Sequence, residues 1–381
     1  MLKQQKIFFD FLRFCIGSAK EIPGSMKEVD WKKIYAIAKK QCLVGVLFDG
    51  IKRLPKELAP EQKLLMQWMV MAEMIRKQNI RLFQNSVKVC QNFENEGFAN
   101  CILKGQGNAL LYPNPYMRTP GDIDIYLSGG RRKIMKYVDQ VCPNQVMRYH
   151  HVDFPVMKTA IEVHFTPSYM FFPIHNRRMQ KWFRKVMDLQ CSNVVTLPDG
   201  YGEITVPTTS FNVIYILSHL YRHIFTEGIG LRQLLDYYYV LVKWHTDLTN
   251  LTDSNKSLPQ MTQINTDLDA LRHELKYLGL WKFAQAVMYV LHEVFGLSED
   301  RMIAPMDERE GRFLLDEIMR GGNFGQYDDR MGSKVGESKI HRYFRMNLRN
   351  LRFVKHYPTE ALSEPLFRTW FALWKKIHGI K

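Results

Sequence analysis

The sequence predicts an α+β protein in which a short strand-rich segment lies between two long helical regions. Residues 61–93 contain no proline or glycine, and their apolar side chains recur at helical spacing. Residues 98–206 carry short β-like runs instead. Beyond Pro207 the helical pattern returns and continues to the end of the chain. We therefore expect a strand-rich core over residues 98–206, with helical regions over residues 1–97 and 207–381.

The first helical region is expected to end in one long helix, or in two that abut. Residues 61–93 form this helix, and Glu96-Gly97 supplies a glycine at its end. A methionine stripe on the helix is interpreted as core packing rather than as a cofactor contact. The stripe consists of Met66, Met69, Met71 and Met74.

The core segment is predicted to contain four strands, a weaker fifth strand and a helix. The strands cover residues 98–103, 122–127, 149–156, 160–165 and, more weakly, 204–206, and the helix covers residues 131–142. The third and fourth strands are expected to form a hairpin through Lys158-Thr159. In the second helical region, the polar residues 248–258 are predicted to form a loop.

Composition indicates a globular, basic protein with more than one packed unit. The chain has 381 residues, 46% of them hydrophobic, and a formal net charge of +15. That charge favours polyanions or nucleotides as partners, although a merely soluble basic surface is the alternative. Six scattered cysteines without paired spacing indicate a reducing, cytoplasmic environment. We find neither a signal peptide nor a membrane-spanning stretch, and we expect no membrane partner.

Asp122 and Asp124 are the residues with the clearest chemical meaning. They are spaced i, i+2 on a predicted strand, so both side chains point to one face, roughly 7 Å apart. Two like charges held so close repel each other unless a cation lies between them. Mg²⁺ is the expected cation, because it binds to one or two carboxylates together with substrate phosphate oxygens.

The surroundings of this pair are similar to a known superfamily. A strand, a glycine turn and a short helix precede the Asp-Ile-Asp strand, and a third carboxylate follows on a later strand. This order resembles the nucleotidyltransferase superfamily to which DNA polymerase beta belongs. The motifs LKG, YP.P..R..GDIDIYL, IEVHF and H...H....G.GLR.LLD resemble, more narrowly, a bacterial family labelled uncharacterised nucleotidyltransferase. They start at Leu103, Tyr112, Ile161 and His219, and the resemblance covers roughly residues 85–245.

The resemblance implies a polymerase-beta-like mixed sheet and the transfer of a nucleoside monophosphate from a nucleoside triphosphate to an acceptor hydroxyl. Asp122 and Asp124 would share Mg²⁺ or Mn²⁺. Glu162, on an apolar strand, would complete the metal cluster or accept the proton of the hydroxyl. His164 lies on the same face as Glu162 and is either a substrate or metal contact or a structural histidine.

The glycine turn is the expected phosphate site. Gly105 and Gly107 would let backbone N–H groups approach phosphates, and Lys104 would neutralise one of them. The superfamily usually has Gly-Gly or Gly-Ser where this chain has Lys104-Gly105. Arg118 is expected either to contact the triphosphate or to pair with Asp122 or Asp124.

The helical region beyond the core contains further candidate functional residues. His219 and His223 lie at i, i+4 on one helix face, a spacing that suits metal binding, but we expect this face to pack on the sheet and frame the nucleotide. Arg232 and Asp236 are expected to pair with each other. Residues 331–381 hold 11 Lys/Arg against 3 Asp/Glu. We interpret them as packed amphipathic helix with a basic outer face, and RNA binding is the alternative.

These observations favour an Mg²⁺-dependent nucleotidyltransferase whose acceptor is a small molecule, a protein or a nucleic acid. A non-catalytic nucleotide-binding or regulatory module is one alternative. An RNA-modifying or toxin-like nucleotidyltransferase attracted to polyanions is another.

Overall fold

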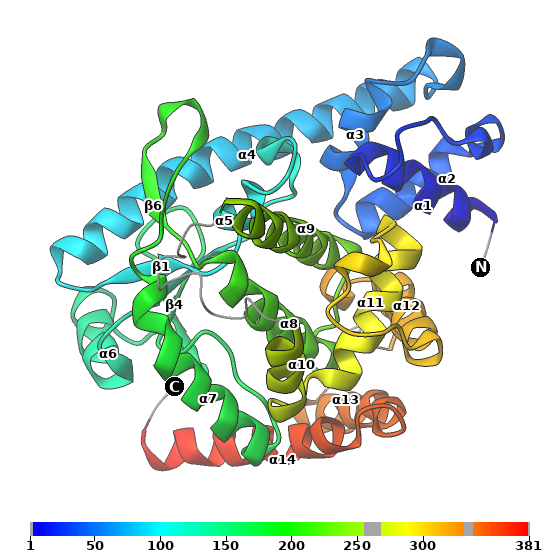
Figure 1. Ribbon diagram of the computed structural model, residues 1–381. Helices are drawn as coiled ribbons and strands as arrows, with labels where there is room; N and C mark the ends of the chain where they lie inside the picture. The colour runs from blue at the N-terminus through cyan, green and yellow to red at the C-terminus, as the bar shows by residue number, and fades with distance from the viewer. Residues whose placement is uncertain (1–2, 255–267, 331–337, 380–381) are drawn as a thin grey trace.

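The strand-rich segment forms a small mixed sheet in the computed structural model of the protein, and helices surround it (Figure 1). The structure describes residues 3–254, 268–330 and 338–379. The order of its elements confirms an α+β fold with large helical regions before and after the sheet. None of the described helices combines the length and the apolar character needed to cross a membrane.

The helical elements before the core and within it differ widely in length. They are α1 (Lys3–Ile16), η1 (Gly24–Glu28), α2 (Trp31–Lys40), α3 (Val44–Ile51), η2 (Lys56–Leu58), α4 (Gln62–Asn95), α5 (Gln106–Ala109), η3 (Pro115–Met117), α6 (Gly130–Val141), α7 (Pro173–Gln190) and η4 (Pro198–Gly200). The helical elements after the core are α8 (Thr209–Phe225), α9 (Leu231–Ser254), α10 (Leu268–Tyr277), α11 (Trp281–Phe295), η6 (Glu299–Arg301), α12 (Glu308–Gly321), η7 (Asn323–Gly325), α13 (Lys339–Val354) and α14 (Pro358–Ile377).

The main sheet has the strand order β1-β2-β4-β3. Its strands are β1 (Asn100–Ile102), β2 (Ile123–Leu127), β3 (His151–Asp153) and β4 (Ile161–His164). β2 and β4 are parallel, whereas β1 and β3 pair antiparallel on the outside. All four predicted strands and the β3–β4 hairpin are confirmed, although each strand is shorter than expected.

The weaker predicted strand is also confirmed, as part of a second small sheet. It corresponds to β6 (Glu203–Thr205), which pairs with β5 (Val194–Thr196). The sequence analysis missed β5 and the preceding helix α7. Met179, Trp182, Phe183 and Val186 of α7 are buried and recur at helical spacing, so the signal for this helix was present.

The core beneath the main sheet is aliphatic and aromatic. Ile123, Ile125 and Leu127 of β2 are fully buried, as their alternation with Asp124 predicts. They belong to one cluster with Ile134 and Val138 of α6 and with the second half of α4. The two faces of β2 therefore differ: one packs in this core, and the other carries the charged residues.

Helix α4 is one continuous helix that joins two hydrophobic cores. Trp68 in its first half packs with the N-terminal helices, and Phe93 in its second half packs under the sheet. Asn79, between them, donates hydrogen bonds to the carbonyls of Tyr116 (2.7 Å) and Arg118 (2.8 Å). Helix α4 thus fixes the segment that leads into β2.

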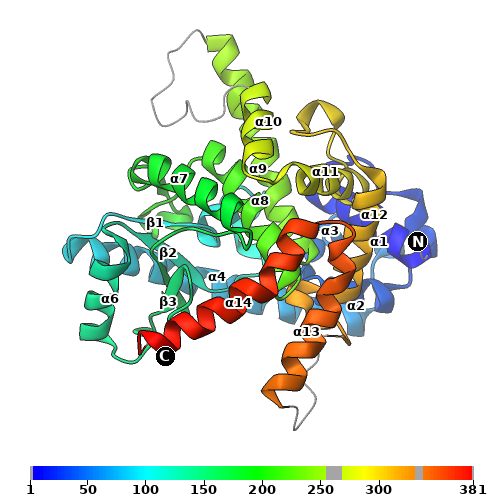
Figure 2. The same cartoon turned by 90° about the horizontal axis from the view of Figure 1, so that it is seen from below.

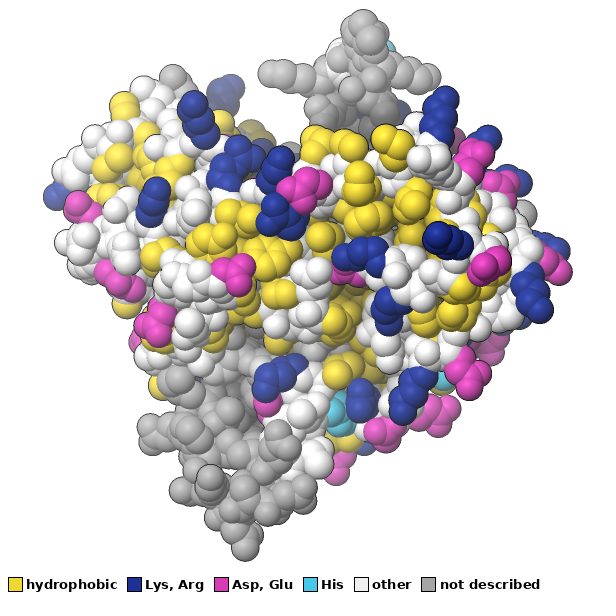
Figure 3. All heavy atoms as spheres, turned by 90° about the horizontal axis from the view of Figure 1, so that it is seen from above, with side chains coloured by type: hydrophobic (Ala, Val, Ile, Leu, Met, Phe, Trp, Pro, Cys, Tyr) yellow, Lys and Arg dark blue, Asp and Glu magenta, His cyan; other side chains and the backbone are white. Residues whose placement is uncertain are grey.

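The interpretation of the methionine stripe as core packing was wrong for three of its four members. Met66, Met69 and Met74 are 51–59% exposed, whereas Met71 is half-buried. The buried face of α4 in this stretch carries Ala72 and Ile75 instead, each of which follows the stripe residues Met71 and Met74 by one position. Figure 3, seen from above Figure 1, shows hydrophobic side chains gathered on the side of the molecule where α4 lies.

The C-terminal region is helical throughout its described residues, and two expectations about it change. The predicted loop at residues 248–258 continues as helix α9 to Ser254, and the remainder of that stretch lies outside the described residues. Helices α13 and α14 form a hairpin (Figure 2). Its outer surface is not simply basic, because large apolar side chains are exposed there: Phe344, Leu348, Leu351, Leu362, Leu366, Trp370, Leu373 and Ile377.

Candidate active site

The pairing of two parallel strands brings Asp124 and Glu162 together. β2 and β4 are in register with Asp124 beside Glu162, so both side chains lie on one face of the sheet. Nε2 of His164 lies 3.1 Å from Oδ1 of Asp124 and 3.5 Å from Oε2 of Glu162. Asp124, Glu162 and His164 each offer a ligand atom within 4.8 Å of the others. Asp122 lies one residue before β2, at the edge of the adjacent pocket.

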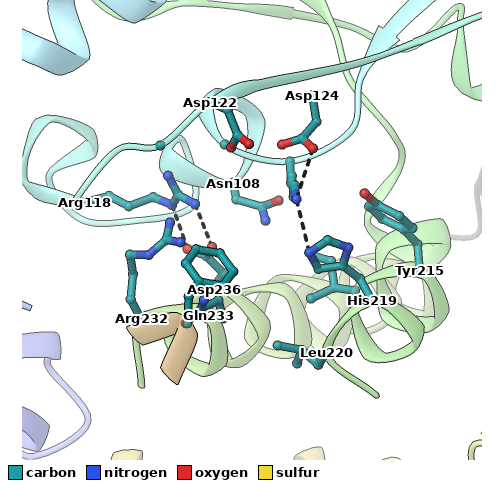
Figure 4. Close-up of a pocket in the computed structure, with 15 residues that line it drawn as sticks. Asn108, Arg118, Asp122, Asp124, Tyr215, His219, Leu220, Arg232, Gln233 and Asp236 are labelled. Atoms are coloured by element: carbon teal, nitrogen blue, oxygen red, sulfur yellow. Dashed lines mark hydrogen bonds and ion pairs between the residues drawn. The ribbon is translucent and has the colours of Figure 1, made fainter. Parts of the chain in front are cut away.

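Lys104 connects the sheet to the helices beyond the core. The backbone N–H of Leu103 donates to the carbonyl of Asp124 (2.9 Å), which extends the strand pairing up to Lys104. The Nζ atom of Lys104 lies 3.1 Å from Oδ1 of Asp124 and 3.1 Å from Nε2 of His219 on α8. Figure 4 shows these two contacts between Asp124 on one wall of the pocket and His219 on the other.

The two glycines of the turn have different surroundings. Gly105 lines the pocket and has φ +64°, a conformation that residues with a Cβ rarely adopt. A Cβ on Gly107 would instead lie 2.9 Å from Cγ1 of Val206. Gly107 is not among the residues that line the pocket, and packing accounts for the absence of its side chain. The structure therefore brings Gly105 to the site and places Gly107 behind it.

Arg118 pairs with a residue that the sequence analysis assigned to another partner. Its Nε and Nη2 atoms donate to the two carboxylate oxygens of Asp236 on α9, at 2.7 and 2.8 Å. The hydroxyl of Tyr112 also donates to Asp236, at 2.7 Å. The expected Arg232–Asp236 hydrogen bond does not form, and Arg232 donates to the carbonyl of Thr119 instead. The alternative pairing of Arg118 with Asp122 or Asp124 is likewise wrong.

The pocket between these walls is small and rich in unpaired polar atoms. Its volume of about 40 Å³ holds only a few water molecules. Within the described part of the chain, four buried polar atoms of its lining residues have no hydrogen-bond partner: Arg118 Nη1, Asp124 Oδ2, Tyr215 Oη and Gln233 Nε2. Buried polar atoms are normally paired, so this arrangement indicates a site for a polar ligand.

The electrostatics of the carboxylates reflect their crowding. Repulsion from Asp124, followed by burial, raises the pKa of Asp122 to about 6. Burial also opposes ionisation of Asp124, but Lys104 and His164 outweigh it and hold the pKa of Asp124 well below its usual range. Burial opposes ionisation of Glu162 too, yet the hydrogen bond with His164 leaves the pKa of Glu162 lowered. Asp124 and Glu162 are thus ionised at neutral pH, while Asp122 holds its proton in mildly acidic solution.

Of the two histidines of α8, His219 lines the pocket from the helical side, whereas His223 is not among the lining residues. Burial lowers the pKa of His219 and of His223, to about 4 for His223. His223 Nδ1 lies 2.9 Å from the Glu227 carboxylate. Among the described residues, the groups of side chains with metal-ligand spacing do not include His219 or His223. His219 meets the sheet side of the pocket through Lys104, whereas His223 contacts Glu227 and the ring of Phe324 in η7.

Edge strand β3 and the residue before it add three residues that the sequence analysis did not single out: His150, His151 and Asp153. Asp153 pairs in register with Glu162, and His151 pairs with His164. His151, Asp153 and Glu162 offer ligand atoms within 4.8 Å of one another, and so do His150, His151 and His164. The predicted hairpin carried the signal, because residues paired across two strands share a face.

The raised pKa of Asp122 predicts a pH dependence of stability. Folded Asp122 binds its proton up to about pH 6, whereas the unfolded residue ionises near pH 4, so the folded state holds more protons between these values. The contribution of Asp122 to the free energy of unfolding should therefore fall as pH rises through this window, by on the order of 2 kcal/mol. Urea unfolding of wild type and Asp122→Asn from pH 4 to 7 measures this. Parallel curves for the two proteins would contradict the prediction.

The Arg118–Asp236 pair should be essential for stability. Asp236→Asn leaves a buried guanidinium without its counter-charge, and we expect a loss of about 3–5 kcal/mol in the free energy of unfolding. Asp247→Asn on the same helix removes a more exposed carboxylate paired with Lys243 and should cost about 1 kcal/mol or less. Denaturant unfolding of both variants compares them. Equal, small losses would mean that the buried pair contributes little.

Comparison of the sequence with known protein families gives one match. A profile of the family described as "uncharacterised nucleotidyltransferase" matches residues 27–296. No curated protein and no solved structure matches the chain significantly. The matched residues run from the N-terminal helices to the end of α11 and include both walls of the pocket. The chain therefore belongs to this family of uncharacterised nucleotidyltransferases.

Proposed function

We propose that the protein is an Mg²⁺-dependent nucleotidyltransferase that moves a nucleoside monophosphate from a nucleoside triphosphate to an acceptor hydroxyl. The observation that carries the proposal is the convergence of carboxylates beside a lysine and a glycine turn. Asp124 and Glu162 are neighbours on β2 and β4, Asp122 lies one residue before β2, and Lys104 and Gly105 line the pocket beside them. Such a site combines ligands for a cation with groups that attract phosphates.

The donor set fits a divalent cation. Oδ2 of Asp124 is buried and has no hydrogen-bond partner, and Asp122 repels Asp124 at close range. Asp122, Asp124 and Glu162 would hold Mg²⁺ or Mn²⁺ through carboxylate oxygens, the ligands that these ions prefer. The bound ion would neutralise the pyrophosphate leaving group and activate the acceptor oxygen.

The phosphate-binding residues would have to give up contacts that they make with each other. Lys104 would leave Asp124 and bind a phosphate oxygen, which exposes the carboxylate to the cation. Gly105 would allow a phosphate to reach backbone N–H groups. Arg118 would keep its two bonds to Asp236 and donate from Nη1, its unpaired atom. The pocket has room for only a few water molecules between these side chains, so binding of a triphosphate would need this rearrangement.

The transfer step needs a proton acceptor. The acceptor oxygen attacks the α-phosphorus, the bond to the bridging oxygen of pyrophosphate breaks, and pyrophosphate leaves with its electron pair. The hydroxyl proton would pass to the carboxylate of Glu162, which is ionised at neutral pH and whose side chain is 29% exposed. His164, hydrogen-bonded to both Asp124 and Glu162, would hold the two carboxylates in position.

Two substitutions should separate binding from chemistry. Asp124→Asn should abolish Mg²⁺-dependent binding of nucleoside triphosphate, measured by calorimetry with each of the four ribonucleotides. Glu162→Gln should still bind the triphosphate but release pyrophosphate roughly 10²-fold more slowly, with water as the default acceptor. Asp139→Asn, at an exposed carboxylate on α6, is the matched control. Equal Mg²⁺-dependent binding by wild type and Asp124→Asn would remove the proposal.

Replacing Lys104 should change the affinities for Mg²⁺ and for nucleoside triphosphate in opposite directions. Lys104→Met removes the cation that competes for Asp124, so Mg²⁺ alone should bind more tightly to the variant than to wild type. Triphosphate binding should weaken, because a charge partner for phosphate is lost. Lys136→Met, at an exposed lysine of α6, should change neither affinity. Unchanged binding of both ligands to Lys104→Met would place the phosphates elsewhere.

A further inference from the structure

Helix α14 carries a stripe of large apolar side chains that are exposed. The side chains recur every three or four residues, so they share one face of the helix. They are 50–80% exposed, and with a rise of about 1.5 Å per residue the stripe runs about 22 Å along α14. The members of this α14 stripe are Leu362, Leu366, Trp370, Leu373 and Ile377.

Helix α13 adds a second stripe of the same kind. Its members are Phe344, Leu348 and Leu351, and they are 58–68% exposed. The hydroxyl oxygens of Tyr343 on α13 and Thr369 on α14 lie 3.0 Å apart, so Phe344 and Trp370, the next residues of the two helices, flank one contact. Figure 2 shows the hairpin of α13 and α14 lying across the lower side of the molecule.

Other side chains of α14 attach the hairpin to the rest of the protein. The ring of Phe367 stacks on Tyr169 with centroids 5.1 Å apart, and the buried Glu360 carboxylate accepts the backbone N–H of Phe171 at 2.7 Å. Phe371 and Trp374 pack against the core beneath the main sheet. The α14 stripe is therefore not needed to hold the helix in place. Exposed apolar surfaces of this extent usually mark a site of interaction.

The exposed charges on this hairpin have one sign. Residues 338–379 contain nine Lys/Arg and two Asp/Glu. Both carboxylates, Glu360 and Glu364, are only 1% exposed. Lys355 is exposed four residues beyond the α13 stripe and on its face, and Lys376 is exposed beside the end of the α14 stripe. Within the described part of the hairpin, the apolar surface is thus accompanied by exposed lysines and by no exposed carboxylate.

This combination favours a lipid surface over the other possible occupants. A second copy of the chain would bring a net charge of +15 against +15, and Lys355 and Lys376 would find no exposed carboxylate on the described part of the other hairpin. RNA would match the charge, but it binds through phosphates and base stacking and would leave the leucines and Ile377 uncovered. An anionic bilayer offers acyl chains to the apolar stripes and negative headgroups to the lysines.

We propose that the α13–α14 hairpin binds the surface of an anionic lipid bilayer. The two stripes would lie at the boundary between headgroups and acyl chains, where the ring of Trp370 is well suited, and Lys355 and Lys376 would contact the headgroups. The sequence analysis expected no membrane partner because no stretch could span a bilayer, but a hairpin that lies on the surface needs no such stretch. The proposal does not depend on the proposed transferase activity.

Flotation of the full-length protein with lipid vesicles tests the proposal. Wild type should bind to vesicles of phosphatidylcholine and phosphatidylglycerol, much less to phosphatidylcholine alone, and more weakly as salt is added. Leu366→Gln/Leu373→Gln should bind at least tenfold more weakly, because two apolar contacts are lost. Met66→Gln/Met69→Gln changes similarly exposed side chains on α4, at the opposite side of the molecule (Figure 1), and should bind as wild type does.

Several outcomes would overturn the proposal. Wild type that fails to bind anionic vesicles, or that binds uncharged vesicles equally well, would contradict an anionic bilayer as the partner. Equal binding by wild type and Leu366→Gln/Leu373→Gln would show that the α14 stripe is not the contact. Light scattering without lipid tests the main competitor. A wild-type dimer that becomes a monomer in the same double variant would assign the stripe to a second copy of the chain.

Discussion

Asp124 places a carboxylate where only 2% of the residue is exposed, and a charge at such a position is stable only with partners. Lys104 and His164 supply them, each at 3.1 Å from the same oxygen. This requirement fixes much of the site. Lys104 has to lie just after β1, and His164 has to lie on β4. His219 on α8 then contacts the same lysine nitrogen from the opposite side of the pocket. Removing any one of them leaves a buried charge or a buried donor unpaired.

The fold class, and the shared face of Asp122 and Asp124, could be predicted from the sequence because they depend on short-range patterns. Alternation along β2 puts Asp122 and Asp124 opposite the buried isoleucines, and the glycine turn needs Gly105 at φ +64°. Parallel pairing of β2 with β4 then brings in Glu162. The alternation along β2 holds for any strand of this pattern, but the place of Glu162 depends on tertiary pairing and was expected only from the resemblance to the nucleotidyltransferase superfamily.

The errors arose where an assignment depended on what lies across the fold. Helical spacing shows that Met66, Met69 and Met74 share a face of α4, but not which way that face points. Arg118 and Asp236 are 118 positions apart, so Arg232 looked like the better partner for Asp236.

The two walls of the pocket are joined by contacts of the same kind. Lys104 reaches from the sheet side to His219 on α8, and Arg118 reaches from the segment before β2 to Asp236 on α9. Helix α9 contributes no ligand to the proposed Mg²⁺ site, yet its carboxylate Asp236 sets the position of Arg118, in the segment before β2. In genetic terms, a screen for inactive mutants would recover substitutions on α9 as readily as on β2. The functional unit is therefore the pair of walls, and its boundaries do not follow those of the sheet.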